Sequence, residues 1–188
     1  MVKVRTVKVH TVKVHIKSIL LRSGLQPLRL SAPALKNREM LSMEESTAER
    51  LVLIIENNLN HAQLIESIIK NHSIHYQTAI VKDGVTAMSF LHQQGEYANA
   101  PRPHLILLDL NLPAKDGREI LAEIKSDGAL KRIPIVILTA SSDEEDVFNS
   151  YQLQGNSYVI KAQNLEQLAT IVKRIEEFWL EIVTLPPE

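Results

Sequence analysis

The sequence contains no cysteine. Without thiols the chain can form no disulfide bonds, thiolate metal sites or cysteine nucleophiles, and this usage fits a reducing compartment. Aromatic residues make up only 4% of the 188 residues, so the core must be aliphatic. No apolar run approaches the roughly 18 residues that a membrane-spanning helix requires. We therefore expect a cytoplasmic protein that has no membrane partner.

Acidic residues are missing from residues 1–38, which carry nine basic side chains. The rest of the chain has 12 basic and 22 acidic residues. The net charge of −1 is therefore the sum of a basic N-terminal extension and an acidic remainder of the chain. An acidic body argues against a general nucleic-acid binder, whose surface should be positive.

The N-terminal extension, residues 1–47, does not have the pattern of a folded domain. It opens with three five-residue repeats that begin Val-Lys-Val, and their odd period places valines on both faces of a strand. Three interpretations stay open: a targeting segment, a basic arm that contacts nucleic acid or membrane, or an upstream extension with no structural role that is disordered or an artefact of the assigned translation start. We favour the third, with the natural start at Met40 or Met43, because Met43 lies just before the first expected strand.

From residue 48 to residue 188, strand-like apolar runs alternate with stretches whose apolar residues recur every three to four positions. The runs expected to form strands are residues 50–55, 75–81, 105–109, 133–138 and 156–160. This alternation predicts an α/β fold, a doubly wound five-stranded parallel sheet with helices on both faces. The second run alternates most between apolar and polar residues, which places it nearer an edge of the sheet.

Polar residues stand where the predicted strands end, namely Glu56, Asn57, Asp109, Thr139 and Lys161. The carboxyl ends of parallel strands share one edge of a sheet, so these side chains should converge. Glu56 and Asp109 provide hard oxygen ligands that suit a partly hydrated Mg²⁺. Lys161 can neutralise phosphoryl oxygens, and Thr139 offers them a hydroxyl. Because the set lacks histidine, cysteine and an activated serine, it favours phosphoryl transfer onto Asp109 over acyl transfer.

These strand ends resemble the motifs of two-component receiver domains. The stretches that carry the resemblance are Glu56-Asn57, Leu108–Pro113 with Gly117, Leu138–Ala140 and Tyr158–Lys161. The resemblance covers about residues 50–182 and includes all five strand ends in the right order. It implies the flavodoxin-like receiver fold and the function of a response regulator in a phosphorelay.

The resemblance also implies a role for each matching residue. Asp109 would be the phosphoacceptor, Lys161 its cationic partner and Thr139 the switch hydroxyl. Tyr158 would be the aromatic residue that reorients on activation. The backbone carbonyl of Asn111 would join the carboxylates as a Mg²⁺ ligand. Such a protein takes part in its own phosphorylation and dephosphorylation without being a conventional turnover enzyme.

Two further segments narrow the resemblance. The loop 94–103 and the tail 176–186 are similar to those of response regulators paired with cyanobacterial phytochromes. This similarity implies that a histidine kinase, of which a phytochrome is one candidate, donates the phosphoryl group.

Two positions depart from the family pattern. Asn57 stands where a second acid usually ligates Mg²⁺, so we expect weaker metal binding and slower phosphorylation. Ala162 follows Lys161 where a proline with a cis peptide bond is common. A cis bond before a non-proline residue costs about 2.5–4 kcal/mol, so this bond is either trans or strained.

The chain ends a few residues after the last predicted helix, so we expect the signal to leave through a protein surface. Phe178, Trp179, Leu180 and Val183 belong to a helix with more apolar residues than one face can bury, which suggests a partner interface. The family resemblance implies a homodimer through the fourth helix, fifth strand and fifth helix, and an unknown downstream protein. The alternative is that the tail folds back on its own domain.

Two other functions are alternatives to that of a response regulator. A phosphorylation-independent adaptor of the same fold is motivated by Asn57. A phosphatase with an aspartyl nucleophile would place a second acid two residues after that nucleophile, and Asn111 occupies this position. The residue at that position therefore argues against the phosphatase.

Overall fold

The structure is a computed structural model that describes residues 50–71 and 76–186. The predicted basic extension, residues 1–47, lies outside the described residues. Within the described part, no helix is both long enough and apolar enough to cross a membrane.

Five parallel strands form one sheet in the order β2-β1-β3-β4-β5. Their bounds are β1 Arg50–Ile55, β2 Tyr76–Val81, β3 Leu105–Leu108, β4 Ile135–Thr139 and β5 Ser157–Ile160. The predicted five-stranded parallel sheet is confirmed, and β2 lies at an edge as its alternating sequence indicated. The fourth strand begins at Ile135 rather than Ile133, because Pro134 has no amide hydrogen to donate to a strand ladder.

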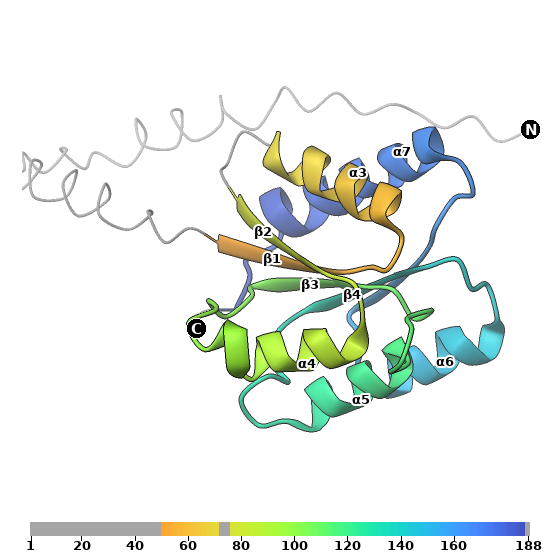
Figure 1. The fold of residues 1–188 in the computed structure, drawn as a ribbon. Helices are drawn as coiled ribbons and strands as arrows, with labels where there is room; N and C mark the ends of the chain where they lie inside the picture. Colours follow the sequence, from red (N-terminus) through yellow and green to blue (C-terminus); the bar gives the residue numbers. More distant parts are fainter. Residues whose placement is uncertain (1–49, 72–75, 187–188) are drawn as a thin grey trace, which may run out of the picture. The chain divides into compact units, whose positions relative to one another are not determined.

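Helices cover both faces of the sheet (Figure 1). α3 and α7 lie on one face, whereas α4, α5 and α6 lie on the other. Their bounds are α3 Leu59–Lys70, α4 Gly84–Leu91, α5 Gly117–Ser126, α6 Glu144–Gln152 and α7 Leu165–Glu176, with the short 3₁₀ turn η1 Gly95–Tyr97 before β3.

Each of these five helices begins directly after an Asp or Asn whose side chain accepts a hydrogen bond from the first turn. These capping residues are Asn58, Asp83, Asp116, Asp143 and Asn164. The caps satisfy amide groups of the first turns and so fix where each strand-to-helix loop ends.

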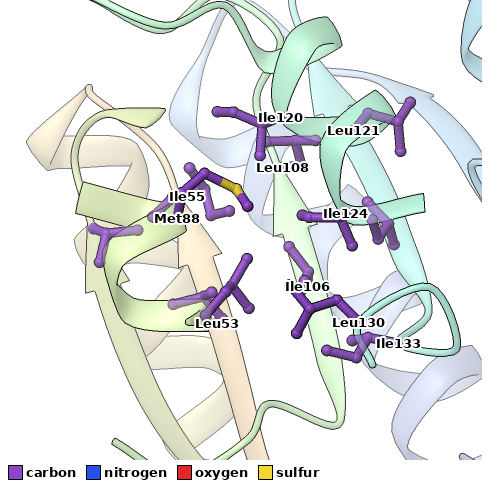
Figure 2. Packing of buried hydrophobic residues seen from close by; sticks show 14 of the residues in the cluster. Leu53, Ile55, Met88, Ile106, Leu108, Ile120, Leu121, Ile124, Leu130 and Ile133 are labelled. Carbon is purple, nitrogen blue, oxygen red and sulfur yellow. The ribbon is translucent and has the colours of Figure 1, made fainter. Parts of the chain in front are cut away.

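The central strands are buried on both sides because successive side chains point to opposite faces. Leu53 and Ile55 of β1 pack with Leu108 of β3 against α4 and α5 (Figure 2). Their neighbours Ile54 and Leu107 belong to the second core, under α3 and α7. Two aliphatic cores therefore hold β1 and β3 rigidly, and these are the strands that lead into Glu56 and Asp109.

The tail after α7 departs from the single helix that was expected. α7 ends at Glu176 and continues as the wider π-helical turn η2 Glu177–Ile182. This turn buries Leu180, whose backbone carbonyl accepts a hydrogen bond of 2.7 Å from the Tyr76 hydroxyl. Trp179 and Val183 are partly buried against the same core, whereas Phe178 is 50% exposed.

The tail therefore folds back on its own domain, as the alternative interpretation held. The side chain of Leu180 is buried in the core of its own domain, so it cannot contact a partner protein. The partner interface stays a prediction, and Phe178 is the most exposed of its four named residues.

Candidate functional site

Four polar residues at the carboxyl edge of the sheet are buried together. Glu56 follows β1, Asp109 follows β3, Thr139 ends β4 and Lys161 follows β5. Their exposed fractions are 3% for Glu56, 5% for Asp109, 0% for Thr139 and 7% for Lys161. Buried polar groups need partners, so the contacts among these side chains define the site.

Lys161 lies between the two carboxylates. Its Nζ donates to Glu56 Oε2 at 2.7 Å and to Asp109 Oδ2 at 2.7 Å. Such charge-assisted hydrogen bonds compensate for the loss of water around all three ions. The structure thus brings together residues that stand 105 and 52 positions apart in the sequence.

The remaining carboxylate oxygens are held by backbone amides of the adjoining loops. The amide of Asn58 donates to Glu56 Oε1 at 2.9 Å, and the amide of Asn111 donates to Asp109 Oδ1 at 3.2 Å. Both carboxylates are therefore fixed in orientation before any ligand arrives.

Thr139 is connected to the loop that carries Asp109. The Asn111 side-chain amide donates to Thr139 Oγ1 at 3.4 Å, and the backbone amide of Ser141 donates to the same oxygen at 3.4 Å. Sequence reasoning assigned only the backbone carbonyl of Asn111, so this side-chain contact was missed. A polar side chain two residues after the acid was the only signal for it.

The oxygen ligands at this edge suit a hard cation. Glu56 and Asp109 supply two carboxylates, whereas Asn57 is exposed and contributes at most a neutral oxygen. In the part of the chain that the structure describes, no three His, Asp or Glu side chains cluster in a way that could hold a metal. Mg²⁺ is commonly bound through one or two carboxylates and keeps several waters, so the donor set fits it without a third acid.

The peptide bond after Lys161 is trans, since none of the bonds between described residues is cis. Of the two alternatives for Lys161-Ala162, the structure therefore has the unstrained one. Lys161 still reaches both carboxylates, so a proline at position 162 is not needed to place its ammonium group.

Tyr158 on β5 points toward the loop after β4. Its hydroxyl donates to the backbone carbonyl of Ser141 at 3.1 Å, and its ring packs partly buried against the core under α5. Burial raises the pKa of Tyr158 above its usual value of 10.0. The phenol therefore remains a neutral hydrogen-bond donor to the loop that follows Thr139.

An ion-pair network beside the site was not predicted from the sequence. Arg118, in the first turn of α5, donates from Nε to Asp146 Oδ1 at 2.6 Å, and its Nη2 contacts the other oxygen of that carboxylate. Ser141 Oγ donates to Asp146 Oδ2 at 2.5 Å. Hydrogen bonds from Arg118 and then Ser141 lower the pKa of Asp146. Asp146 also belongs to the acidic first turn of α6, where a negative charge interacts favourably with the helix dipole.

A buried carboxylate at a strand end, paired with an ammonium group and followed by a loop that contacts a buried hydroxyl, can accept a phosphoryl group and hold its charge. The chain belongs to the response regulator receiver domain family, which it matches over residues 52–173. This match confirms the family that the strand-end motifs indicated.

Individual response regulators are similar to the chain over most of their length. It is 52% identical over 143 residues to the response regulator Rcp1 of Synechocystis, across 76% of this chain and 97% of Rcp1. The crystal structure of Mn²⁺-bound Rcp1 is similar with a TM-score of 0.72, and the match covers 73% of this chain and 99% of that one at 52% identity. The phosphorylated cyanobacterial phytochrome response regulator RcpA is 54% identical, with a TM-score of 0.72 over 74% of this chain and all of RcpA. The chain is thus a response regulator homologous to those of phytochromes.

Proposed function

We propose that Asp109 accepts a phosphoryl group from a phosphohistidine of a histidine kinase. An Asp109 carboxylate oxygen attacks phosphorus, the phosphorus–nitrogen bond breaks, and the kinase histidine leaves with its electron pair. Lys161 carries this proposal, because its ammonium lies 2.7 Å from Asp109 Oδ2. From that position it can neutralise the oxygens of the transferred group.

Mg²⁺ is the proposed cofactor, held by Glu56, Asp109 and the backbone carbonyl of Asn111. The ion supplies charge neutralisation to the phosphoryl oxygens when it is bound. Asn57 makes the site less negative by one formal charge than a site with two acids after β1. We therefore expect weaker Mg²⁺ binding than such a site would have.

The output follows from the charge that phosphorylation adds, about 1.5–2 negative charges at neutral pH. Thr139 and Lys161 would close on the phosphoryl group, and Tyr158 would follow the loop after β4. The surface of β5 and α7 would then change its affinity for a downstream protein or a second copy of the chain. We place this signalling in the cytoplasm, with a phytochrome as the candidate kinase and without nucleic acid or membrane as partners.

The direct test is acyl-phosphate formation. The full chain is incubated with Mg²⁺ and acetyl phosphate beside an Asp109→Asn control, and intact mass is followed. One added phosphoryl group in the wild type, absent from the control, is the expected result. No gain in a folded sample at any Mg²⁺ concentration would contradict the proposal.

A phosphorylation-independent adaptor is the second candidate, and the exposed Asn57 is the observation that favours it. The variant Asn57→Asp separates the two functions. If Asp109 is a phosphoacceptor limited by its metal, the variant should bind Mg²⁺ about tenfold more tightly and become phosphorylated faster. An unchanged Mg²⁺ titration would exclude position 57 from the metal site.

A further inference from the structure

Arg118 joins the start of α5 to the start of α6. It pairs through two nitrogens with both oxygens of Asp146, and its Nη1 donates to Asp116 Oδ2 at 3.0 Å. Asp116 is itself the residue that caps α5, through a hydrogen bond of 2.8 Å from the Arg118 amide. The guanidinium is therefore held on two sides by carboxylates from different segments.

The network extends from Asp146 to the segment that carries the predicted switch hydroxyl. Ser141 Oγ donates to Asp146 at 2.5 Å, and Ser141 is only two residues after Thr139. Both backbone polar groups of Ser141 are also hydrogen-bonded. Its amide donates to Thr139 Oγ1, and its carbonyl accepts from the Tyr158 hydroxyl. Asp146 therefore anchors the segment 139–141 through the Ser141 side chain.

We propose that Arg118 is a positioning residue for phosphoryl transfer. Through Asp146 and Ser141 it fixes the segment 139–141, and so it holds the Thr139 hydroxyl beside the loop of Asp109. This inference rests on the proposed function, because it assumes that Asp109 receives the phosphoryl group. Arg118 itself touches none of the reacting atoms.

The geometry of this network differs from that of an ordinary surface ion pair. The side chain of Asp146 is 14% exposed and that of Arg118 is 33% exposed. Two parallel donors to one carboxylate fix its orientation as well as its charge, which a lysine cannot do. The pair Lys70–Glu66 on α3, at 2.7 Å and with Lys70 55% exposed, provides a matched pair remote from the site.

The first experiment compares phosphorylation rates with acetyl phosphate and Mg²⁺ in the full chain. In Arg118→Met we expect the maximal rate to fall about tenfold, while the half-saturating acetyl phosphate concentration stays within about twofold. Arg118→Lys should recover only part of the rate, because it keeps the charge and loses the paired donors. Lys70→Met is the control, and its rate should stay within about twofold of the wild type.

A double variant distinguishes a positioning role of Arg118 from a general loss of stability. If Arg118 acts through Thr139, then Arg118→Met should cause no further slowing in a Thr139→Val protein. An equal further slowing there would overturn the proposal. If Arg118→Met does not fold, Asp146→Ala removes the same contact and takes its place in both comparisons.

Amide hydrogen exchange tests the role of Arg118 without metal or acetyl phosphate. Hydrogen exchange at the Ser141 amide should be faster in Arg118→Met than in the wild type or in Lys70→Met, and unchanged exchange would overturn the proposal. If neither the wild type nor Asn57→Asp is phosphorylated, the proposed function fails. Hydrogen exchange then still decides whether Arg118 fixes the segment 139–141.

Discussion

Replacement of Lys161 by methionine tests whether the buried ions at the sheet edge are coupled as the structure indicates. The substitution keeps an unbranched, apolar side chain of similar length and removes the ammonium group. It leaves the carboxylates of Glu56 and Asp109, whose side chains are 3% and 6% exposed, without the cation that lies 2.7 Å from each. The variant therefore retains two buried negative charges and their mutual repulsion.

The expected loss of stability follows from that geometry. Removal of one partner from a buried, hydrogen-bonded ion pair costs about 3–5 kcal/mol. With an m-value of about 2 kcal/mol per molar urea, this loss lowers the unfolding midpoint by about 1.5–2.5 M. Urea unfolding at neutral pH, followed by far-UV circular dichroism without divalent cations, measures the shift.

The matched control is Lys131→Met, because Lys131 is exposed and lies away from the site. Its free energy of unfolding should change by less than about 0.5 kcal/mol. A loss below about 1 kcal/mol in Lys161→Met would refute the reasoning. It would mean that the two carboxylates do not depend on Lys161 for their compensation.

Two further predictions concern the neighbourhood of this site. Gly117→Ala should destabilise the domain by about 1–3 kcal/mol, because its methyl would lie 2.5 Å from Leu110 Cα in the loop that carries Asp109. The control Gly128→Ala meets nothing within 4 Å, and thermal unfolding of both variants measures the difference. The lowered pKa of Asp146 means that its contact with Arg118 stabilises the fold above pH 3.8, its usual pKa, and that this contribution is lost as the pH falls through the lowered value. The stability difference between wild type and Asp146→Asn should therefore be constant above about pH 5 and shrink below pH 4, and constancy down to pH 2 would contradict the assignment.

The sheet could be predicted from the sequence because its three central strands are buried on both faces. β1 forms at residues 50–55 as expected, since a short aliphatic run that ends in polar residues is typical of a strand buried on both faces. The cap at Asn58 was predictable for a similar reason, because its side chain bonds to the next turn of its own chain. Convergence of Glu56, Asp109 and Lys161 followed from the topology of a parallel sheet alone.

Contacts that depend on tertiary register could not be predicted in this way. Nothing local in the sequence pairs Arg118 with Asp146, which stands 28 positions further on. The widened turn after Glu176 shifts the helical periodicity, so Leu180 turns into the core although it lies off the apolar stripe of α7. The hydrogen bond from Tyr76 to the Leu180 carbonyl spans 104 positions and is equally invisible to local patterns.

The position of Lys161 on the last strand has a consequence for how the domain is made. During synthesis, Glu56 and Asp109 leave the ribosome long before their shared cation, which comes 105 residues after the first of them. Closing a loop of that length is entropically costly, and contacts of such separation form slowly. The two carboxylates can therefore be buried at low cost only after β5 has been added to the sheet, so the site matures in the final stage of folding.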